Sequence, residues 1–126
     1  MYTINLKNED GENVVAVVDA CSVSDAENQM LEEYNNACSV TAVKETRFAE
    51  VLEDECDNGD WYIVEVSVSD MDSEKTSVDK FLIFAENTMQ AQIYADKLTS
   101  GYVADTEIKS VKKTKISIVK TNKPKL

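Results

Sequence analysis

The sequence predicts an α+β protein built from a duplicated strand–strand–helix–strand unit, with about six strands in mixed sheets and two helices packed on their apolar faces. Two segments, 43–52 and 111–120, match in register, because Val, Lys, Thr and a second Val recur and Arg47 corresponds to Lys115. Each of these matching segments follows a helix-like segment, which itself follows two strand-like segments. At 126 residues, the chain suits one compact domain or two small halves that share a core.

Alternating and continuous apolar runs predict the strands. Tyr2, Ile4 and Leu6 alternate with polar residues, as expected of a half-buried strand. The run 14–18 is continuous and β-branched, which is typical of a strand covered on both faces. The predicted strands cover residues 2–7, 14–18, 40–52, 61–68, 78–84 and 108–119.

Two segments with apolar residues at helical spacing predict the helices. The first begins at Ser22 or Ser24, which compete as N-caps because each has an acidic residue three positions later. It ends at Asn35-Asn36, since Asn tolerates the left-handed conformation found there. The second helix begins after Asn87 and closes at Ser100-Gly101.

The two halves align element by element. The alignment pairs Tyr2 with Tyr62, Ala20 with Ala85, Ala26 with Ala91 and Val43 with Val111. We therefore expect one compact pseudo-symmetric domain, which consists of a first repeat over 1–55, an acidic junction over 56–60, a second repeat over 61–120 and a basic tail over 121–126.

Charge is unevenly distributed along the chain, whose net charge is −11. Residues 1–108 carry all 24 acidic residues and six basic ones, a balance of −18, whereas 109–126 carry seven lysines and no acid, a balance of +7. The densest acidic patch comprises Glu53, Asp54, Glu55, Asp57 and Asp60. A one-signed patch attracts partners of opposite charge, although a solvated acidic surface with a neutralising tail is the simpler interpretation.

Composition excludes several classes of enzyme and metal site. The absence of histidine excludes Ser-His-Asp and Cys-His catalysis and a Cys/His zinc site. Cys21, Cys38 and Cys56 form no C-x-x-C pair, so we expect free thiols in a reducing cytoplasm. No apolar run long enough to span a membrane and no signal-peptide pattern occurs, which favours a cytoplasmic protein. We expect neither an enzyme nor a cofactor, because the sequence has no phosphate-binding loop and no nucleophile elbow.

The acidic junction partly fits the loop of an EF-hand calcium site. Asp54 would take position 1, Asn58 position 5 and Glu65 position 12, and Asp60 is a further oxygen ligand in the same stretch. Cys56 would take position 3, where a hard cation prefers oxygen, so a solvated acidic turn is the favoured interpretation. The candidates for acid–base chemistry, none of which has a companion base, are Asp54, Asp57, Asp60 and Glu65.

The lysines near the end of the chain suggest a nucleic-acid interface. They are Lys109, Lys112, Lys113, Lys115 and Lys120, extended by Lys123 and Lys125. A basic strand near Trp61, Tyr62 and Tyr102 would suit single strands, whose bases stack on aromatic rings. Lysines also protect a sheet edge from aggregation, and the 24 acids would repel a polyanion, which favours the protective role.

The chain resembles domain-of-unknown-function family 4494, small proteins of Bacteroides-type gut bacteria and their tailed phages, over nearly its whole length. The matching residues lie at 18–27, 32–33, 43–52, 60–66 and 110–114, with Val119. The first strand and the loop 69–76 are shorter and less basic than the family leads us to expect. The resemblance rests on structural positions, so it implies a phage or phage-derived context and assigns no functional residue.

These observations lead us to expect a small, non-enzymatic, phage-type accessory protein that binds a macromolecular protein partner. One form of this role is an acidic decoy that acts on host nucleic-acid machinery. The alternatives are single-stranded nucleic-acid binding through the basic last strand and a minor component of a virion or its assembly line. Self-association into a homo-oligomer is a further expectation, because strands at sheet edges pair readily.

Overall fold

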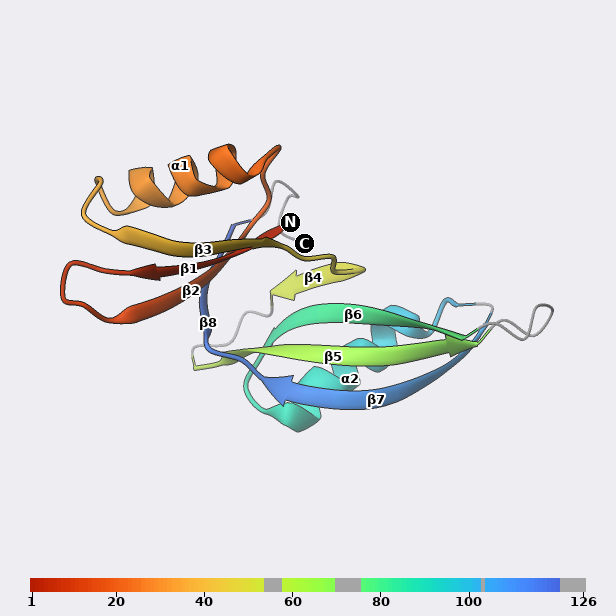
Figure 1. Cartoon of the computed structure of the whole chain (residues 1–126). Helices are drawn as coiled ribbons and strands as arrows, with labels where there is room; N and C mark the ends of the chain where they lie inside the picture. Colours follow the sequence, from red (N-terminus) through yellow and green to blue (C-terminus); the bar gives the residue numbers. More distant parts are fainter. Residues whose placement is uncertain (54–57, 70–75, 103, 121–126) are drawn as a thin grey trace. The chain divides into compact units, whose positions relative to one another are not determined.

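The structure is a computed structural model that describes residues 1–53, 58–69, 76–102 and 104–120 (Figure 1). Its elements in chain order are β1 (Tyr2–Lys7), β2 (Asn13–Val18), α1 (Val23–Glu33), β3 (Ser39–Glu45), β4 (Glu50–Glu53), β5 (Asp60–Ser69), β6 (Thr76–Ala85), α2 (Thr88–Thr99), β7 (Asp105–Lys113) and β8 (Ile116–Lys120). They form two compact units: the first comprises Met1–Arg47 with Lys115–Leu126, and the second comprises Phe48–Thr114. Two helices and two mixed sheets confirm the predicted α+β class.

The first unit is a four-stranded sheet with α1 on one face (Figure 1). Its strand order is β3-β1-β2-β8, in which β1 is antiparallel to both neighbours and β8 is parallel to β2. Alternation along the strands points one set of side chains toward α1. The buried core of this unit comprises Ile4, Leu6, Ala16, Val18, Ala26 and Met30.

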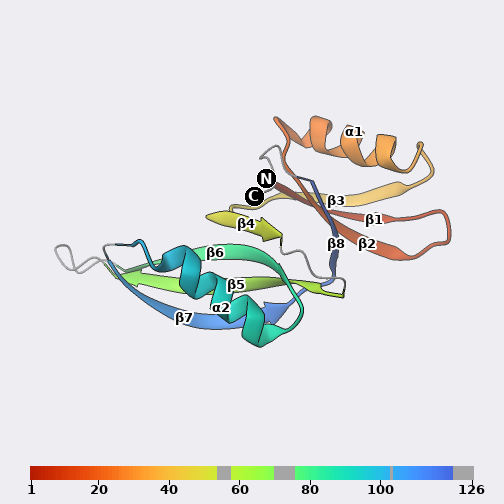
Figure 2. The same cartoon turned by 180° about the vertical axis from the view of Figure 1, so that it is seen from behind.

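The second unit repeats this arrangement with α2 across one face of its sheet (Figure 2). The order is β4-β6-β5-β7, in which β5 is antiparallel to both neighbours and β4 is parallel to β6. Its buried core comprises Tyr62, Val64, Val66, Phe81, Ile83, Ala85, Ala91 and Ala95. On the other side of β5 and β6, the rings of Trp61 and Phe84 lie 5.2 Å apart.

The two long strands predicted over 40–52 and 108–119 are each divided into two strands, and the described residues therefore form eight strands instead of six. After β3, the backbone N–H of Thr46 donates to the carbonyl of Met1, directly before the partner strand β1 begins. After β7, the N–H of Thr114 donates in the same way to the carbonyl of Trp61. Beyond each of these points the chain crosses to the other unit, where its backbone groups find new partners. There β4 pairs with β6, and β8 pairs with β2. Neither break is marked by a glycine or a proline, so the sequence did not reveal it.

The pairing registers of the two units correspond to one another. Tyr2 lies opposite Glu45 in the first unit, and Tyr62 lies opposite Lys113 in the second. A register shift interrupts the pairing after Asn5 in β1 and after Glu65 in β5, which are equivalent positions. We call β4 and β8 the exchanged strands, because each follows a strand of one sheet in sequence and pairs in the other sheet. Lys120 pairs with Val18, and Leu52 pairs with Ile83, so the two exchanged strands also occupy equivalent places.

Both helices begin at equivalent side-chain caps. The Ser22 hydroxyl accepts a hydrogen bond from the backbone N–H of Asp25 at 3.1 Å. The Asn87 side-chain oxygen accepts one from the N–H of Gln90 at 2.9 Å. Of the two predicted starts for the first helix, Ser22 is therefore the N-cap, and Ser24 lies inside the helix. Asn35 and Asn36 follow with φ of 52° and 64°, the left-handed conformation expected at a helix end.

Candidate functional site

The five candidate lysines of the nucleic-acid interface do not share one strand. Lys109, Lys112 and Lys113 belong to β7 in the second unit, whereas Lys115 and Lys120 belong to the first unit. Since β7 is an edge strand, its lysines fit the protective role considered for them. Lys109 is also the residue skipped by the register shift, because Ser110 pairs with Glu65 and Ile108 pairs with Val66. Such bulges are a common feature of protected edges.

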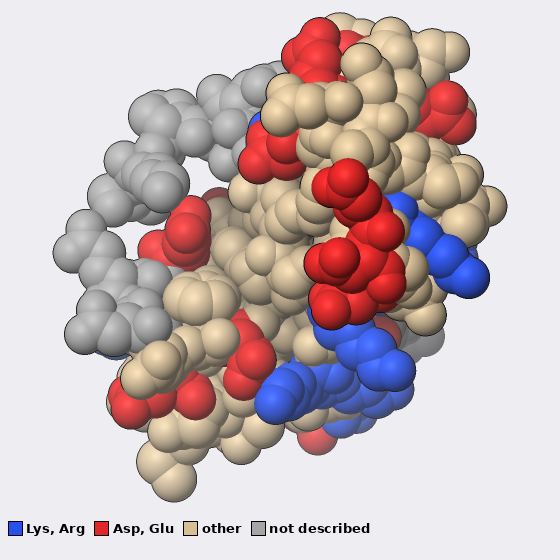
Figure 3. All heavy atoms as spheres, turned by 90° about the vertical axis from the view of Figure 1, so that its left-hand side faces the viewer, with Lys and Arg blue, Asp and Glu red and all other residues tan. Residues whose placement is uncertain are grey.

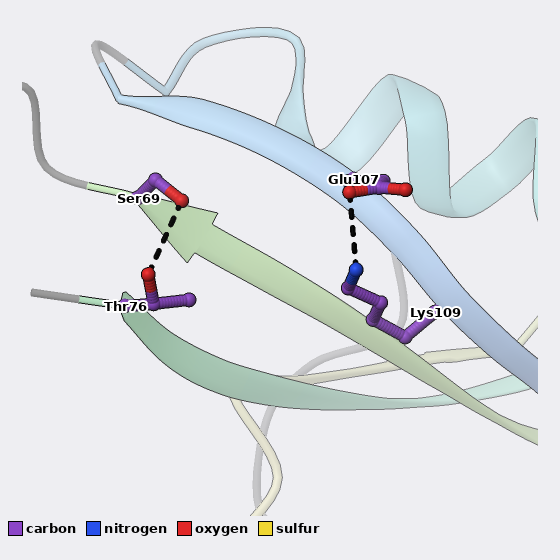
Figure 4. A network of polar contacts seen from close by, with 4 residues as sticks. All are labelled: Ser69, Thr76, Glu107 and Lys109. Atoms are coloured by element: carbon purple, nitrogen blue, oxygen red, sulfur yellow. Dashed lines mark hydrogen bonds and ion pairs between the residues drawn. The ribbon is translucent and has the colours of Figure 1, made fainter.

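Three of the five lysines form ion pairs with carboxylates. The Nζ atom of Lys109 lies 3.1 Å from an oxygen of Glu107 on the same strand (Figure 4). Lys113 Nζ lies 3.3 Å from an oxygen of Asp60, and Lys120 pairs with Glu33 of α1. All three pairs are exposed, so each contributes little stability and is weakened by salt. They nevertheless reduce the positive potential that a phosphate backbone would meet.

The acidic patch predicted around the junction is described at two of its five residues. Glu53 ends β4 opposite Phe84, and Asp60 begins β5 opposite Ala85. These pairings bring Glu53 and Asp60 to the same end of the second sheet, where Glu86 follows β6. We call Glu53, Asp60 and Glu86 the acidic end. The other predicted members, Asp54, Glu55 and Asp57, lie outside the described residues.

The geometry of β5 separates two members of the calcium hypothesis. Asp60 and Glu65 lie on the same strand five residues apart, which is about 17 Å at the rise of an extended chain. Their side chains also alternate to opposite faces of the sheet, so they cannot ligate one ion. Asn58 is exposed, and Asp54 lies outside the described residues. Among the residues that the structure describes, no group of three or more His, Cys, Asp or Glu side chains is placed to hold a metal ion.

A polar cluster that the sequence did not single out lies at the β4 side of the second sheet, on the face that α2 covers. Tyr102, which follows α2 and is 37% exposed, interacts electrostatically with Asp79 of β6 and Glu50 of β4. Partial burial raises the pKa of Tyr102 above its ordinary value of 10.0, and the negative charges of Asp79 and Glu50 raise this pKa further. The sequence signal for this cluster is an acidic residue two positions before a core residue on the same strand, because residues two apart share one face of a sheet. Asp79 precedes Phe81 in this way, and Glu50 precedes Leu52.

Charge differs strongly between the two units. As sequence segments, the second unit has 15 acidic and six basic residues, a net charge of −9, whereas the first has nine acidic and seven basic residues, a net charge of −2. Figure 3 shows both acidic and basic side chains at the surface on the face that it draws. The charge surplus of the whole chain therefore comes mainly from the second unit.

The outward faces of the two helices also differ, a feature that the sequence interpretation did not include. Met89 and Ile93 of α2 are exposed by 70% and 39%. Their counterparts in the aligned repeat are Ser24 and Asn28 of α1, both polar and exposed. In the described residues, no helix is long and apolar enough to cross a membrane.

Comparison with known proteins gives one match, to the model of the family described as a domain of unknown function (DUF4494), over residues 6–121. This match covers most of the chain, which belongs to this family. No curated protein and no solved structure was found to be similar.

Proposed function

We propose that this member of the DUF4494 family is a non-enzymatic accessory protein of phage type that binds a basic macromolecular partner through its second unit. Its role would be that of an acidic decoy, which occupies the nucleic-acid groove of a host enzyme by electrostatic complementarity. The observation that carries this proposal is the net charge of −9 on the second unit against −2 on the first. Basic nucleic-acid enzymes are the partners that such a charge selects.

Two further features support a decoy over a nucleic-acid binder. The candidate lysines are divided between the two units, and Lys109, Lys113 and Lys120 are each paired with a carboxylate. A polyanion would have to displace these carboxylates and approach a strongly negative unit, at a cost that rises as salt is lowered. A basic protein would gain from the same charges.

We also infer that the two halves arose by duplication of the strand–strand–helix–strand unit. The support is that equivalent residues share registers, bulges and caps in both units. The duplicated unit then includes an exchanged last strand, β4 in one half and β8 in the other. Duplication leaves one copy free to change its surface, which is consistent with the concentration of charge in the second unit.

Affinity capture from host lysate with mass spectrometry tests the decoy proposal. The tagged wild-type chain is compared with a variant that neutralises the acidic end, Glu53→Gln, Asp60→Asn and Glu86→Gln. A matched control removes the same charge from exposed residues of the first unit, Glu9→Gln, Glu12→Gln and Glu32→Gln. We expect a basic nucleic-acid enzyme to be captured by the wild type and the control and to be depleted by the acidic-end variant.

Two outcomes would favour the alternatives. Salt-dependent binding of labelled single-stranded DNA that is lost on replacing Lys112, Lys113 and Lys115 with Ala would assign the protein to nucleic-acid binding. Presence of the chain in purified phage particles would assign it to the virion or its assembly. Capture of no basic nucleic-acid enzyme would contradict the decoy proposal.

A further inference from the structure

The outer surface of α2 carries an apolar ridge, which we define as Met89 and Ile93. An α-helix turns about 100° per residue, so each of these residues lies about 160° around the helix from Ala91. Ala91 and Ala95 are fully buried against the sheet, which places the ridge on the face directed away from the core. Residues four apart on a helix are neighbours, so the two side chains form one continuous surface.

The ridge is not required by the fold. The equivalent positions of α1 hold Ser24 and Asn28, yet α1 packs on its sheet through equivalent residues, with Ala26 and Met30 in the places of Ala91 and Ala95. A solvent-facing helix surface is normally polar, as in α1. A methionine that is 70% exposed is also well suited to contact a partner, because its side chain is flexible and polarisable.

The charges around the ridge indicate the partner. Glu86 lies just before the helix, and Asp96 is one turn beyond Gln92 on the exposed surface. The nearby cation Lys97 is directed toward Tyr94, with its Nζ atom 5.6 Å from the ring centroid. The ridge is thus bordered by acidic side chains on a unit of net charge −9. Two copies of this surface would bring like charges together, which disfavours α2-to-α2 dimers.

We propose that the α2 ridge is the apolar centre of the partner interface, and that its partner is a basic protein surface with an apolar centre, such as an amphipathic helix rich in lysine and arginine. This inference rests on the proposed function, because it identifies the place on the acidic second unit that contacts the basic partner. Acidic residues around the ridge attract the basic rim, and Met89 and Ile93 bury apolar area against the centre. The acidic charge accelerates association, whereas the ridge lengthens the lifetime of the complex.

Fluorescence anisotropy with two labelled peptides tests the assignment. One is a helical peptide with a leucine face and a lysine rim, and the other is an oligolysine of the same charge and length. The ridge variant is Met89→Ser with Ile93→Asn, which installs the residues of α1. The control is Gln92→Ala, which changes an exposed residue of the same helix outside the ridge. Circular dichroism establishes that all three proteins are folded.

We expect the wild type and the control to bind the amphipathic peptide at least about tenfold more tightly than oligolysine, as burial of an apolar anchor would provide. The ridge variant should lose this preference and keep its affinity for oligolysine. Equal affinities of the wild type for both peptides would overturn the ridge assignment and leave the proposal of a basic partner standing. Failure to bind either peptide at low salt would overturn both. Concentration-dependent dimerisation that the ridge variant abolishes would replace the basic partner with a second copy of the chain.

Discussion

The two units share a backbone plan and differ in what they present to solvent. Their sheets have corresponding strand orders, register shifts and helix caps. Their cores differ in detail, since Met30 of α1 corresponds to Ala95 of α2, and Ala16 of β2 corresponds to Phe81 of β6. Large and small residues have exchanged places across the helix–sheet contact, which keeps each core filled. Buried positions therefore preserve volume, whereas exposed positions have diverged freely.

The largest expected effect comes from breaking this balance of volumes. Met30→Ala should lower the free energy of unfolding by about 3 kcal/mol, because it leaves a cavity under a fully buried side chain. Ala95→Met should lower the free energy of unfolding by about 2 kcal/mol for the opposite reason, since the core of the second unit has no room for a larger side chain at this position. Urea unfolding monitored by circular dichroism measures both values. Asn28→Ala is the exposed control, and a loss below about 1 kcal/mol for Met30→Ala would show that the Met30 side chain is not tightly packed in the core.

The exchanged strands give the next effect and the sharpest test of the topology. Leu52 and Ile118 are partly buried against the second and first cores, respectively. Replacing either with Ala should cost about 1.5 kcal/mol. Hydrogen exchange should locate the loss: Leu52→Ala should accelerate exchange in β6, although Leu52 follows the first helix in sequence, and Ile118→Ala should accelerate exchange in β2. The reverse pattern would show that each strand remains with its own half.

The helix caps provide a smaller and matched pair of changes. Ser22→Ala and Asn87→Ala should each cost about 1 kcal/mol, because each leaves a backbone N–H of the first helical turn without its acceptor. Ser24→Ala serves as the control, since Ser24 lies inside α1. Thermal unfolding compares the three variants. A larger loss for Ser24→Ala than for Ser22→Ala would place the helix start at the other predicted position.

The smallest effect concerns pH, and it distinguishes the second unit. Folding favours the neutral form of Tyr102, whose pKa is raised from 10.0 by burial and by Asp79 and Glu50. The contribution of neutral Tyr102 to the free energy of unfolding is therefore fully present below pH 10.0. This contribution decreases as the pH rises above 10.0 toward the pKa of Tyr102 in the folded protein. Spectrophotometric titration should show one tyrosine ionising later than the others. Tyr102→Phe should remove this late step, and Asp79→Asn should move it to lower pH; an unchanged titration curve in both variants would contradict the assignment.

Much of the architecture could be predicted from the sequence, because local patterns determine it. Alternation placed β1 and β5, Asn87 located the start of α2, and the start of α1 was narrowed to Ser22 or Ser24, of which the structure selects Ser22. The divided strands could not be predicted, since the points at Thr46 and Thr114 where the chain leaves one sheet depend on where the neighbouring strands β1 and β5 begin. The pairing of lysines with acids was hidden for a similar reason: Lys120 meets Glu33 and Lys113 meets Asp60 only after the strands have paired.

The position of β8 has a consequence for the order in which the protein is made. Strands β1 and β2 and helix α1 leave the ribosome early, but their sheet lacks its fourth strand until residues 116–120 have been synthesised. During that interval, the valine-rich strand β2 presents an unpaired edge, which is a typical starting point for aggregation. The part of the fold that is begun first is therefore finished last, and slow translation of the second half would prolong the exposure of β2.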